Sequence, residues 1–301
     1  MPKPTDFPPA RDSAPRSLSP PHPIRPALPW RVGGQVWDFQ RPLLMGVLNA
    51  TPDSFSDGGE FVEVEAAMAQ ARHLAAEGAD IIDLGGASSH PLARPTPAQE
   101  ELERIAPVVE RLLRELPLPL SIDTQKPEVA EACLRLGAHL INDVSGLADP
   151  AMARLAARHQ VPLVLMFNTL TAPKGQGAAF LPSMVEFFRE RIARAEAAGA
   201  RYLILDPGYG FGKTLDENLT LLRGLHHLAP FQRPVLVCTS RKGSLGRITG
   251  EKDPKLRLGA TLATSLYAVR EGAHMIRVHD VQALHQELLT WHAIESVQIP
   301  G

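Results

Sequence analysis

Short apolar runs recur along the chain from Arg41 onward. Each is followed by a glycine-rich or polar cluster and then by a stretch with helical spacing of its apolar residues. Eight runs occur: 43–48, 81–84, 118–122, 139–141, 161–166, 202–205, 234–237 and 275–278. They are continuous rather than alternating, which is typical of parallel strands covered on both faces.

The stretches between these runs predict helices, among them 64–77, 127–136, 184–198 and 254–271. Each of the four ends at a glycine, the residue that favours the left-handed backbone at a helix C-terminus. Strands alternating with helices predict an α/β fold, a single parallel eight-stranded (β/α)₈ TIM barrel. A doubly wound open sheet stays the alternative, because apolar runs do not establish closure.

The first part of the chain differs in composition. Ten of the 28 prolines lie between Pro2 and Pro29, so we expect residues 1–28 to form a proline-rich, disordered tail and residues 29–297 to form the barrel domain. Neither a signal-peptide stretch nor an apolar run of membrane-spanning length is expected. The two cysteines have no metal-type spacing, which fits a reducing, cytoplasmic compartment.

The net charge is −2, from 31 basic and 33 acidic residues, which argues against a generally basic nucleic-acid binder. Polar and ionisable residues instead gather directly after the apolar runs. In a (β/α)₈ barrel these positions meet at the C-terminal mouth, where the active site lies. The candidates in chain order are Asn49, Asp83, Ser89, Asp123, Asn142, Asp206, Ser240, Arg241, Lys242, Arg277 and His279.

Two kinds of group are mixed at this mouth. Arg241, Lys242, Arg277 and His279 are basic and together suit a phosphate or pyrophosphate. Asp123, Asn142 and Asp206 are acceptors, and carboxylates beside a phosphate site would repel the phosphate. They therefore serve a metal ion, a developing positive charge, or a ligand edge with paired N–H donors, such as a guanidine-like heterocycle.

Several features also have structural interpretations. The glycines at 208, 210 and 212 precede Lys213, but their spacing fits neither a Walker loop nor a dinucleotide fingerprint. Asp123 could form a rim salt bridge, and His279 beside Asp280 could belong to a helix N-terminus. No nucleophile elbow accompanies the serines near the rim, which argues against a hydrolytic triad. Cys238 fits a small buried residue of the seventh strand, and His226 and His227 fit the surface.

The rim motifs, in their order, resemble the dihydropteroate synthase family of folate biosynthesis. The matching segments are 45–59, 122–127, 141–143, 206–213, 240–242 and 277–281, and the resemblance spans about residues 41–295. It implies a (β/α)₈ barrel that joins 6-hydroxymethyl-7,8-dihydropterin pyrophosphate to para-aminobenzoate. It also implies a dissociative mechanism, in which pyrophosphate leaves before the amine attacks. Homodimers are common in the family, so the resemblance implies a homodimer as well.

The resemblance assigns roles residue by residue. It implies that Asp206 and Asn142 bind the pterin edge, that Lys242 contacts the ring, and that Asp123 lies near the other end of the ring. Asn49 would help to bind Mg²⁺ together with the pyrophosphate. The leaving group would be held by three residues: Ser89, Arg277 and His279. Phe211 belongs to the matched segment at 206–213 and is assigned to the substrate site.

The sequence departs from the family pattern in two places. After the second run, the usual acid is Ala87 and the usual arginine is His90; after the fifth, the usual Met-His-Met is 166–168, Met-Phe-Asn. The aminobenzoate end therefore looks altered. The alternatives are a pterin-binding paralogue with low activity or another amine, a pterin-dependent methyltransferase domain, and an unrelated phosphate-handling barrel.

Overall fold

Eight parallel strands form the centre of the molecule in the computed structural model, which describes residues 29–50, 59–87 and 95–297. The predicted tail at 1–28 lies outside the described residues. The barrel strands are β3 (Leu43–Asn49), β4 (Ile81–Gly85), β5 (Leu120–Asp123), β6 (Leu140–Asp143), β7 (Leu163–Met166), β8 (Leu203–Asp206), β9 (Leu236–Val237) and β10 (Met275–Val278). All eight predicted runs are confirmed as strands.

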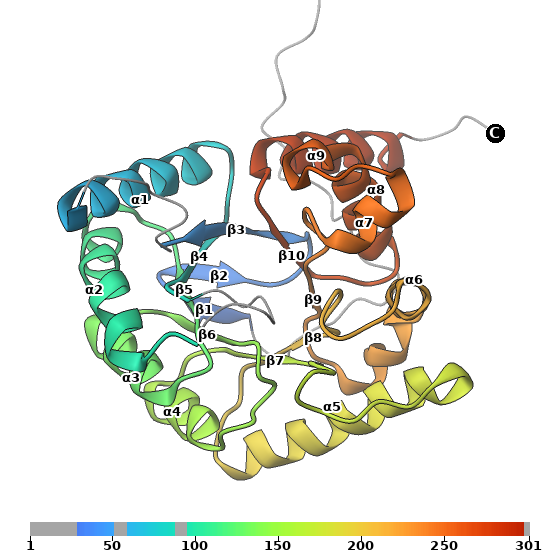
Figure 1. Ribbon diagram of the computed structural model, residues 1–301, viewed down its shortest axis with the longest axis horizontal. Coiled ribbons are helices and arrows are strands. Elements are labelled where there is room, and N and C mark those ends of the chain that lie inside the picture. Colours follow the sequence, from blue (N-terminus) through green and yellow to red (C-terminus); the bar gives the residue numbers. More distant parts are fainter. Residues whose placement is uncertain (1–28, 51–58, 88–94, 298–301) are drawn as a thin grey trace, which may run out of the picture.

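The strands close into a barrel. Seven neighbouring pairs connect them in the order β8-β7-β6-β5-β4-β3-β10-β9, and a parallel bridge between Leu205 and Val235 joins β8 to the β9 side. Figure 1 shows the helices arranged around this centre. The (β/α)₈ prediction is therefore confirmed, and the open doubly wound sheet is excluded.

The surrounding helices are α1 (Gly59–Ala76), α2 (Ala98–Glu115), α3 (Pro127–Leu136), α4 (Ala151–His159), α5 (Phe180–Ala197), α6 (Leu215–Arg223), α7 (Gly243–Thr249), α8 (Leu258–Arg270) and α9 (Val281–Glu295), with short 3₁₀ turns η2 (Gly177–Ala179), η3 (Leu225–Phe231) and η4 (Pro254–Leu256). The prediction for 127–136 is met in full by α3. The predicted helix at 254–271 is divided into η4 and α8. Gly137 ends α3 at a φ of 114°, a conformation that costs glycine little.

A small antiparallel hairpin covers the N-terminal end of the barrel. It consists of β1 (Trp30–Val32) and β2 (Gln35–Trp37), and the glycines at 33 and 34 both take positive φ in the turn. The side chains of Trp30, Trp37 and Phe39 pack with the buried residues that open the barrel strands. These two strands lie before the first predicted run, at 43–48, and were not predicted from the sequence.

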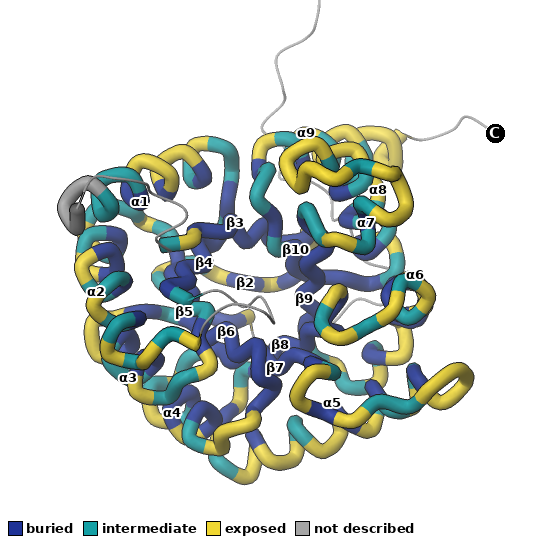
Figure 2. Tube along the Cα trace, viewed as in Figure 1, coloured by how far each residue is buried: buried dark blue, intermediate teal, exposed yellow. Residues whose placement is uncertain are grey.

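A larger apolar core lies between the strands and the helices, and Figure 2 shows the strands buried inside a helical layer with an exposed outer side. Within the described part of the chain, none of the helices has the length and apolar character that a membrane crossing needs. The remaining open end of the barrel is the C-terminal mouth.

Candidate functional site

The predicted acceptors are brought together at the mouth by the strand register. Asp123 is the last residue of β5 and pairs with Asn142 of β6, while Asp206 is the last residue of β8. Asn49 ends β3 and is exposed. Ser89, predicted to contact the leaving group, lies outside the described residues, as does His90.

A buried ion-pair network occupies one side of the mouth. The Arg277 Nε lies 2.6 Å from Asp83 Oδ2, and its Nη2 lies 2.9 Å from Asp123 Oδ2. The Asn142 amide also donates to Asp83 Oδ2, at 3.1 Å. Asp83 has no exposed surface. Arg277 is therefore fixed between two carboxylates, so a ligand anion meets a guanidinium whose charge is already partly compensated.

Asp83 was named among the polar residues of the rim but was given no role in ligand binding. Its signal was available, because it is a carboxylate within the apolar run 81–84, and a charge inside a buried strand needs a partner. The identity of the partner could not be predicted from the sequence pattern, because Arg277 lies 194 positions further along the chain.

Several buried acceptor atoms have no hydrogen-bond partner in the described part of the chain, and we single out two that belong to the residues of the mouth. They are Asn142 Oδ1 and Asp83 Oδ1. An unpaired buried acceptor is costly, so a site that leaves two of them side by side favours a ligand that brings N–H donors.

Asp206 offers a further acceptor on the opposite side of the mouth. One of its carboxylate oxygens, Oδ1, accepts the backbone N–H of Gly208 at 2.7 Å. No hydrogen bond of the second oxygen to a described residue occurs. Burial raises the pKa of Asp206 above its ordinary value, against the effect of the Gly208 bond and of Lys242. The side chain therefore suits a ligand that donates hydrogen bonds to it.

Lys242 and Arg241 are held at the mouth in two different ways. The Lys242 Nζ lies 4.3 Å from the centre of the Phe211 ring, in a cation–π contact. Arg241 forms a two-point ion pair with Asp280, with its Nε 3.1 Å from Oδ2. Lys242 and Phe211 therefore form one wall, whereas the charge of Arg241 is compensated by Asp280.

His279 is not a cation in this site. Its Nδ1 lies 2.8 Å from Ser240 Oγ, and burial lowers the pKa of the ring to about 4, helped by the charges of Arg241 and Arg277. The positive charge at the mouth near neutral pH is therefore expected to come from the arginines and Lys242 rather than from His279. The physical reason is that a buried imidazole beside two guanidinium groups ionises at a cost.

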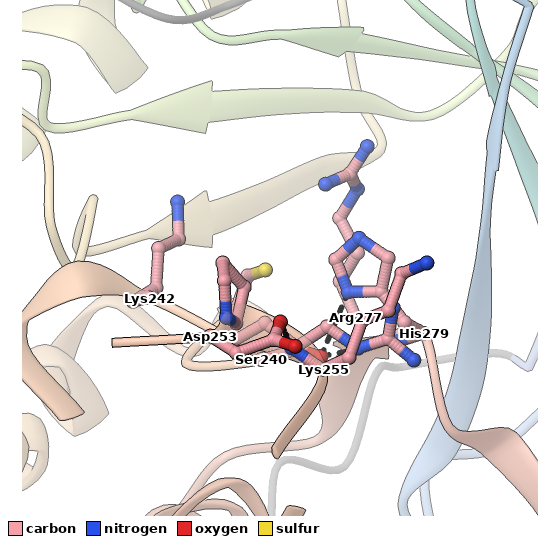
Figure 3. Close-up of a pocket in the computed structure, with 9 residues that line it drawn as sticks. Ser240, Lys242, Asp253, Lys255, Arg277 and His279 are labelled. Carbon is pink, nitrogen blue, oxygen red and sulfur yellow. Dashed lines mark hydrogen bonds between the residues drawn. The ribbon is translucent and has the colours of Figure 1, made fainter. Parts of the chain in front are cut away.

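A pocket of about 420 Å³ opens between these residues (Figure 3). It is lined by Cys238, Ser240, Arg241, Lys242, Asp253, Pro254, Lys255, Arg277 and His279. Cys238 is buried, as predicted, but follows β9 rather than lying within it. The segment that begins η4, with Lys255, was missed, because a surface turn far from any strand end carries no rim signal.

The altered residues after β7 are packing residues. The Phe167 ring is fully buried and lies 5.1 Å from that of Phe187, and the Asn168 amide donates to the Val144 carbonyl at 2.9 Å. These two departures from the family pattern therefore face the protein interior, not the mouth.

The glycine-rich run after β8 is a braced turn. The Lys213 Nζ donates to the carbonyls of Phe167, Gly208 and Phe211, at 2.7 to 3.1 Å. All three donors of this ammonium are thus used by backbone acceptors, so the run does not act as a phosphate loop.

A metal site made wholly of protein ligands is absent from the described residues, in which no group of three His, Cys, Asp or Glu side chains could hold an ion. Mg²⁺ commonly takes one or two protein oxygens together with substrate phosphates. The Asn49 amide is exposed at the mouth and makes no side-chain hydrogen bond to the described residues. Its free oxygen fits an ion that arrives with a pyrophosphate.

Comparison with known proteins gives a consistent result. The family model for pterin-binding enzymes matches residues 45–279. The dihydropteroate synthase of Synechocystis sp. is 42% identical over 269 residues, which cover 87% of this chain and 92% of that protein. The solved structure of Xanthomonas albilineans dihydropteroate synthase with 4-aminobenzoic acid matches with a TM-score of 0.85 and 43% identity, over 90% of this chain and 99% of the other. The same enzyme in complex with 7,8-dihydropteroate matches with a TM-score of 0.81 and 42% identity, over 90% and 100% of the two chains.

Proposed function

The chain belongs to the dihydropteroate synthase family of pterin-binding enzymes, and from this premise we propose how its own residues perform the reaction. The enzyme is a transferase that joins 6-hydroxymethyl-7,8-dihydropterin pyrophosphate to para-aminobenzoate, giving 7,8-dihydropteroate and pyrophosphate. The roles below rest on the geometry of the mouth.

The pterin edge is bound by the acceptors that the fold leaves unpaired. Asn142 Oδ1 and Asp83 Oδ1 are buried without partners among the described residues, and Asp206 ends β8, two strands from the β6 strand that carries Asn142. The pterin presents a guanidine-like row of N–H donors, which matches such acceptors closely. These acceptors of Asn142 and Asp83, which have no partner among the described residues, are the observation that carries the proposal. Lys242 and Phe211 form the adjoining wall against the ring.

The leaving pyrophosphate lies in the basic pocket, against Arg277, His279 and Lys242. As the bond to the pterin methylene breaks, negative charge grows on the pyrophosphate and positive charge grows on the pterin. The donors stabilise the first, while the Asp123 carboxylate stabilises the second. The para-aminobenzoate nitrogen then attacks the methylene carbon and loses a proton. This order is the dissociative route.

Mg²⁺ bound through Asn49 and the pyrophosphate would neutralise charge on the leaving group. Asn49 itself holds its amide oxygen at the end of β3, on the same rim as the pocket residues. The proposal is supported by the exposed, unbonded state of that amide and by the charge of the substrate.

The amine acceptor is para-aminobenzoate, and the two interior residues Phe167 and Asn168 give no reason for another. The competing paralogue with weak turnover rests on the loop that contains Ser89 and His90, outside the described residues. One experiment decides. Purified enzyme receives dihydropterin pyrophosphate, para-aminobenzoate and Mg²⁺, and pyrophosphate and dihydropteroate are assayed separately. Equal yields support the synthase, whereas pyrophosphate without dihydropteroate supports the paralogue.

We further propose a homodimer in a cytoplasmic compartment. Exposed apolar side chains gather along one stretch of chain, at Ile248 of α7, Leu256 of η4 and Leu258 of α8, which supports a contact between copies there. Both cysteines are free thiols, in agreement with a reducing compartment. Light scattering after gel filtration tests the dimer, and Leu256→Asp should shift the mass toward a monomer.

A further inference from the structure

One hydroxyl group contacts two different atoms of His279. Ser240 Oγ lies 2.8 Å from the ring nitrogen Nδ1, and it accepts the backbone N–H of the same histidine at 3.2 Å. Ser240 follows β9 and is 4% exposed, while His279 follows β10, the neighbouring strand. The hydroxyl therefore ties both the backbone and the ring of His279 to the adjacent strand.

The direction of these hydrogen bonds follows from the hydroxyl itself. A serine hydroxyl has one proton to donate. Ser240 Oγ already accepts from the backbone of His279, and the Nδ1 atom is its one hydrogen-bond acceptor among the residues that the structure describes. The proton is thus donated to Nδ1, which must be unprotonated. In a neutral imidazole the remaining proton is then on Nε2.

The surroundings of the ring favour the neutral form. Arg241, Lys242 and Arg277 bring positive charge toward it, whereas Asp280 brings negative charge and is engaged by Arg241. Burial and these cations hold the pKa of His279 at about 4. The ring lines the pocket with no described partner for Nε2, so its N–H is available to a ligand.

We propose that Ser240 is a positioning residue that fixes His279 as the neutral Nε2–H tautomer, aimed so that Nε2 donates a hydrogen bond to an oxygen of the departing pyrophosphate. The inference rests on the proposed function of the pocket. It adds that the contact is a directed neutral donor, and not a second positive charge beside Arg277. Such a donor keeps its strength over the whole neutral pH range.

The tautomer can be observed directly. The protein is labelled with ¹⁵N in the rings of its 11 histidines, and His279→Gln identifies the His279 signals. We expect a protonated Nε2 and an unprotonated Nδ1 from pH 5.5 to 8 in the unmodified enzyme, and exchange between both tautomers in Ser240→Ala. A protonated Nδ1 in the unmodified enzyme, or an unchanged pattern in Ser240→Ala, overturns the proposal.

Kinetics test the function of this geometry. Ser240→Ala should lower kcat/KM for the pterin pyrophosphate about two- to tenfold, the range of one hydrogen bond. In a His279→Gln background the same change should have no further effect, because the group that it positions is gone. Losses that multiply in the double variant overturn the proposal. Ser240→Thr keeps the hydroxyl and should restore both the tautomer and most of the rate.

Ser265→Ala is the matched control. Ser265 is also fully buried, and its hydroxyl contacts Thr239 at 3.4 Å rather than the ring of His279. This variant should leave the tautomer and kcat/KM unchanged. Failure of the proposed function has a different signature, since an unmodified enzyme that forms no dihydropteroate contradicts that function whatever the ¹⁵N spectra show.

Discussion

The guanidinium of Arg277 is bonded through Nε to Asp83 Oδ2 at 2.6 Å, and Asp83 has no exposed surface. The charge of an arginine that is expected to bind an anion is thus partly compensated by a buried carboxylate. The pair fixes the direction of the guanidinium before any ligand arrives. It also makes Asp83, which touches the interior, a residue on which the site depends.

Asp83→Asn should therefore reduce both stability and activity. Removing the charge leaves Arg277 partly uncompensated in a buried place, and breaking a buried pair costs about 3–5 kcal/mol. Because asparagine keeps the shape and one acceptor, we expect a loss near the lower value, about 3 kcal/mol, in urea unfolding. Glu186→Gln, which breaks the exposed pair with Arg189, should change stability by less than about 1 kcal/mol. Equal losses of stability in the two variants would show that the buried pair of Asp83 and Arg277 contributes no more than an exposed ion pair.

Asp206→Asn should weaken pterin binding at least tenfold. The amide brings donors to an atom that must accept from the pterin, and a charged hydrogen bond contributes about 1.5–3 kcal/mol. Calorimetry with the bare pterin measures the effect. Asp143→Asn is the control, because that buried carboxylate is used by Ser145 and the Leu147 backbone and should affect stability alone. An unchanged affinity in Asp206→Asn would remove this residue from the pterin site.

Arg277→Ala and His279→Ala should weaken binding of the pyrophosphate-bearing ligand far more than binding of the bare pterin. Both side chains line the basic pocket, which is the site that we propose for the pyrophosphate. A loss of tenfold or more for the first ligand corresponds to about 1.4 kcal/mol. Calorimetry with the two ligands in parallel is the measurement, and similar losses for both would contradict the assignment.

Asp123 should give the pH profile of kcat/KM an acid limb near pH 7. Burial raises the pKa of Asp123 to about 7, against the opposing charge of Arg277, and the ionised form is the one that stabilises the pterin cation. The rate should fall as the pH drops below about 7, and the limb should vanish in Asp123→Asn. A limb that persists in this variant belongs to another group.

The same pKa makes a prediction for stability. In the unfolded chain Asp123 ionises near pH 3.8, whereas in the fold it ionises near 7. Between these values the folded protein keeps a proton that the unfolded chain has lost. This carboxyl therefore lowers the free energy of unfolding as the pH rises from about 4 to about 7, and has no further effect above that range. The difference in stability between unmodified enzyme and Asp123→Asn, measured by urea unfolding along this range, isolates the contribution.

Asn49→Ala should reduce the dependence of pyrophosphate binding on Mg²⁺. Calorimetry with pyrophosphate, with and without Mg²⁺, reads this without any turnover. The unmodified enzyme should bind more tightly when Mg²⁺ is present, and the variant should lose most of that gain while keeping its affinity in the absence of the ion. A gain that is the same in both proteins would take Asn49 out of the metal site.

The strands were predictable because a covered parallel strand must be apolar throughout, and the mouth followed because polar residues directly after such strands share one end of the barrel. The hairpin at 30–37 was not predicted, because two strands of three residues each have too few positions to show a pattern. Gly33-Gly34 is the one turn signal that this segment carries.

The electrostatic state of the site was beyond the sequence. Basic residues at a rim predict positive charge, but Arg241 is bound by Asp280, Arg277 is bound by Asp83, and burial lowers the pKa of His279 to about 4. Each outcome depends on which side chains meet across neighbouring strands and how deeply they are buried. Those are properties of the packed barrel, and residue types in order do not contain them.

The hairpin β1–β2 gives the molecule a polarity that is useful at the bench. Because Trp30 packs beneath the strands at the closed end, the hairpin lies on the side of the barrel away from the mouth. A protein attached to a sensor chip or a bead through an exposed residue of this hairpin, such as Val36, would present every molecule with the substrate opening toward the solution. Ligand exchange could then be followed on an oriented layer, without a tether crossing the entrance.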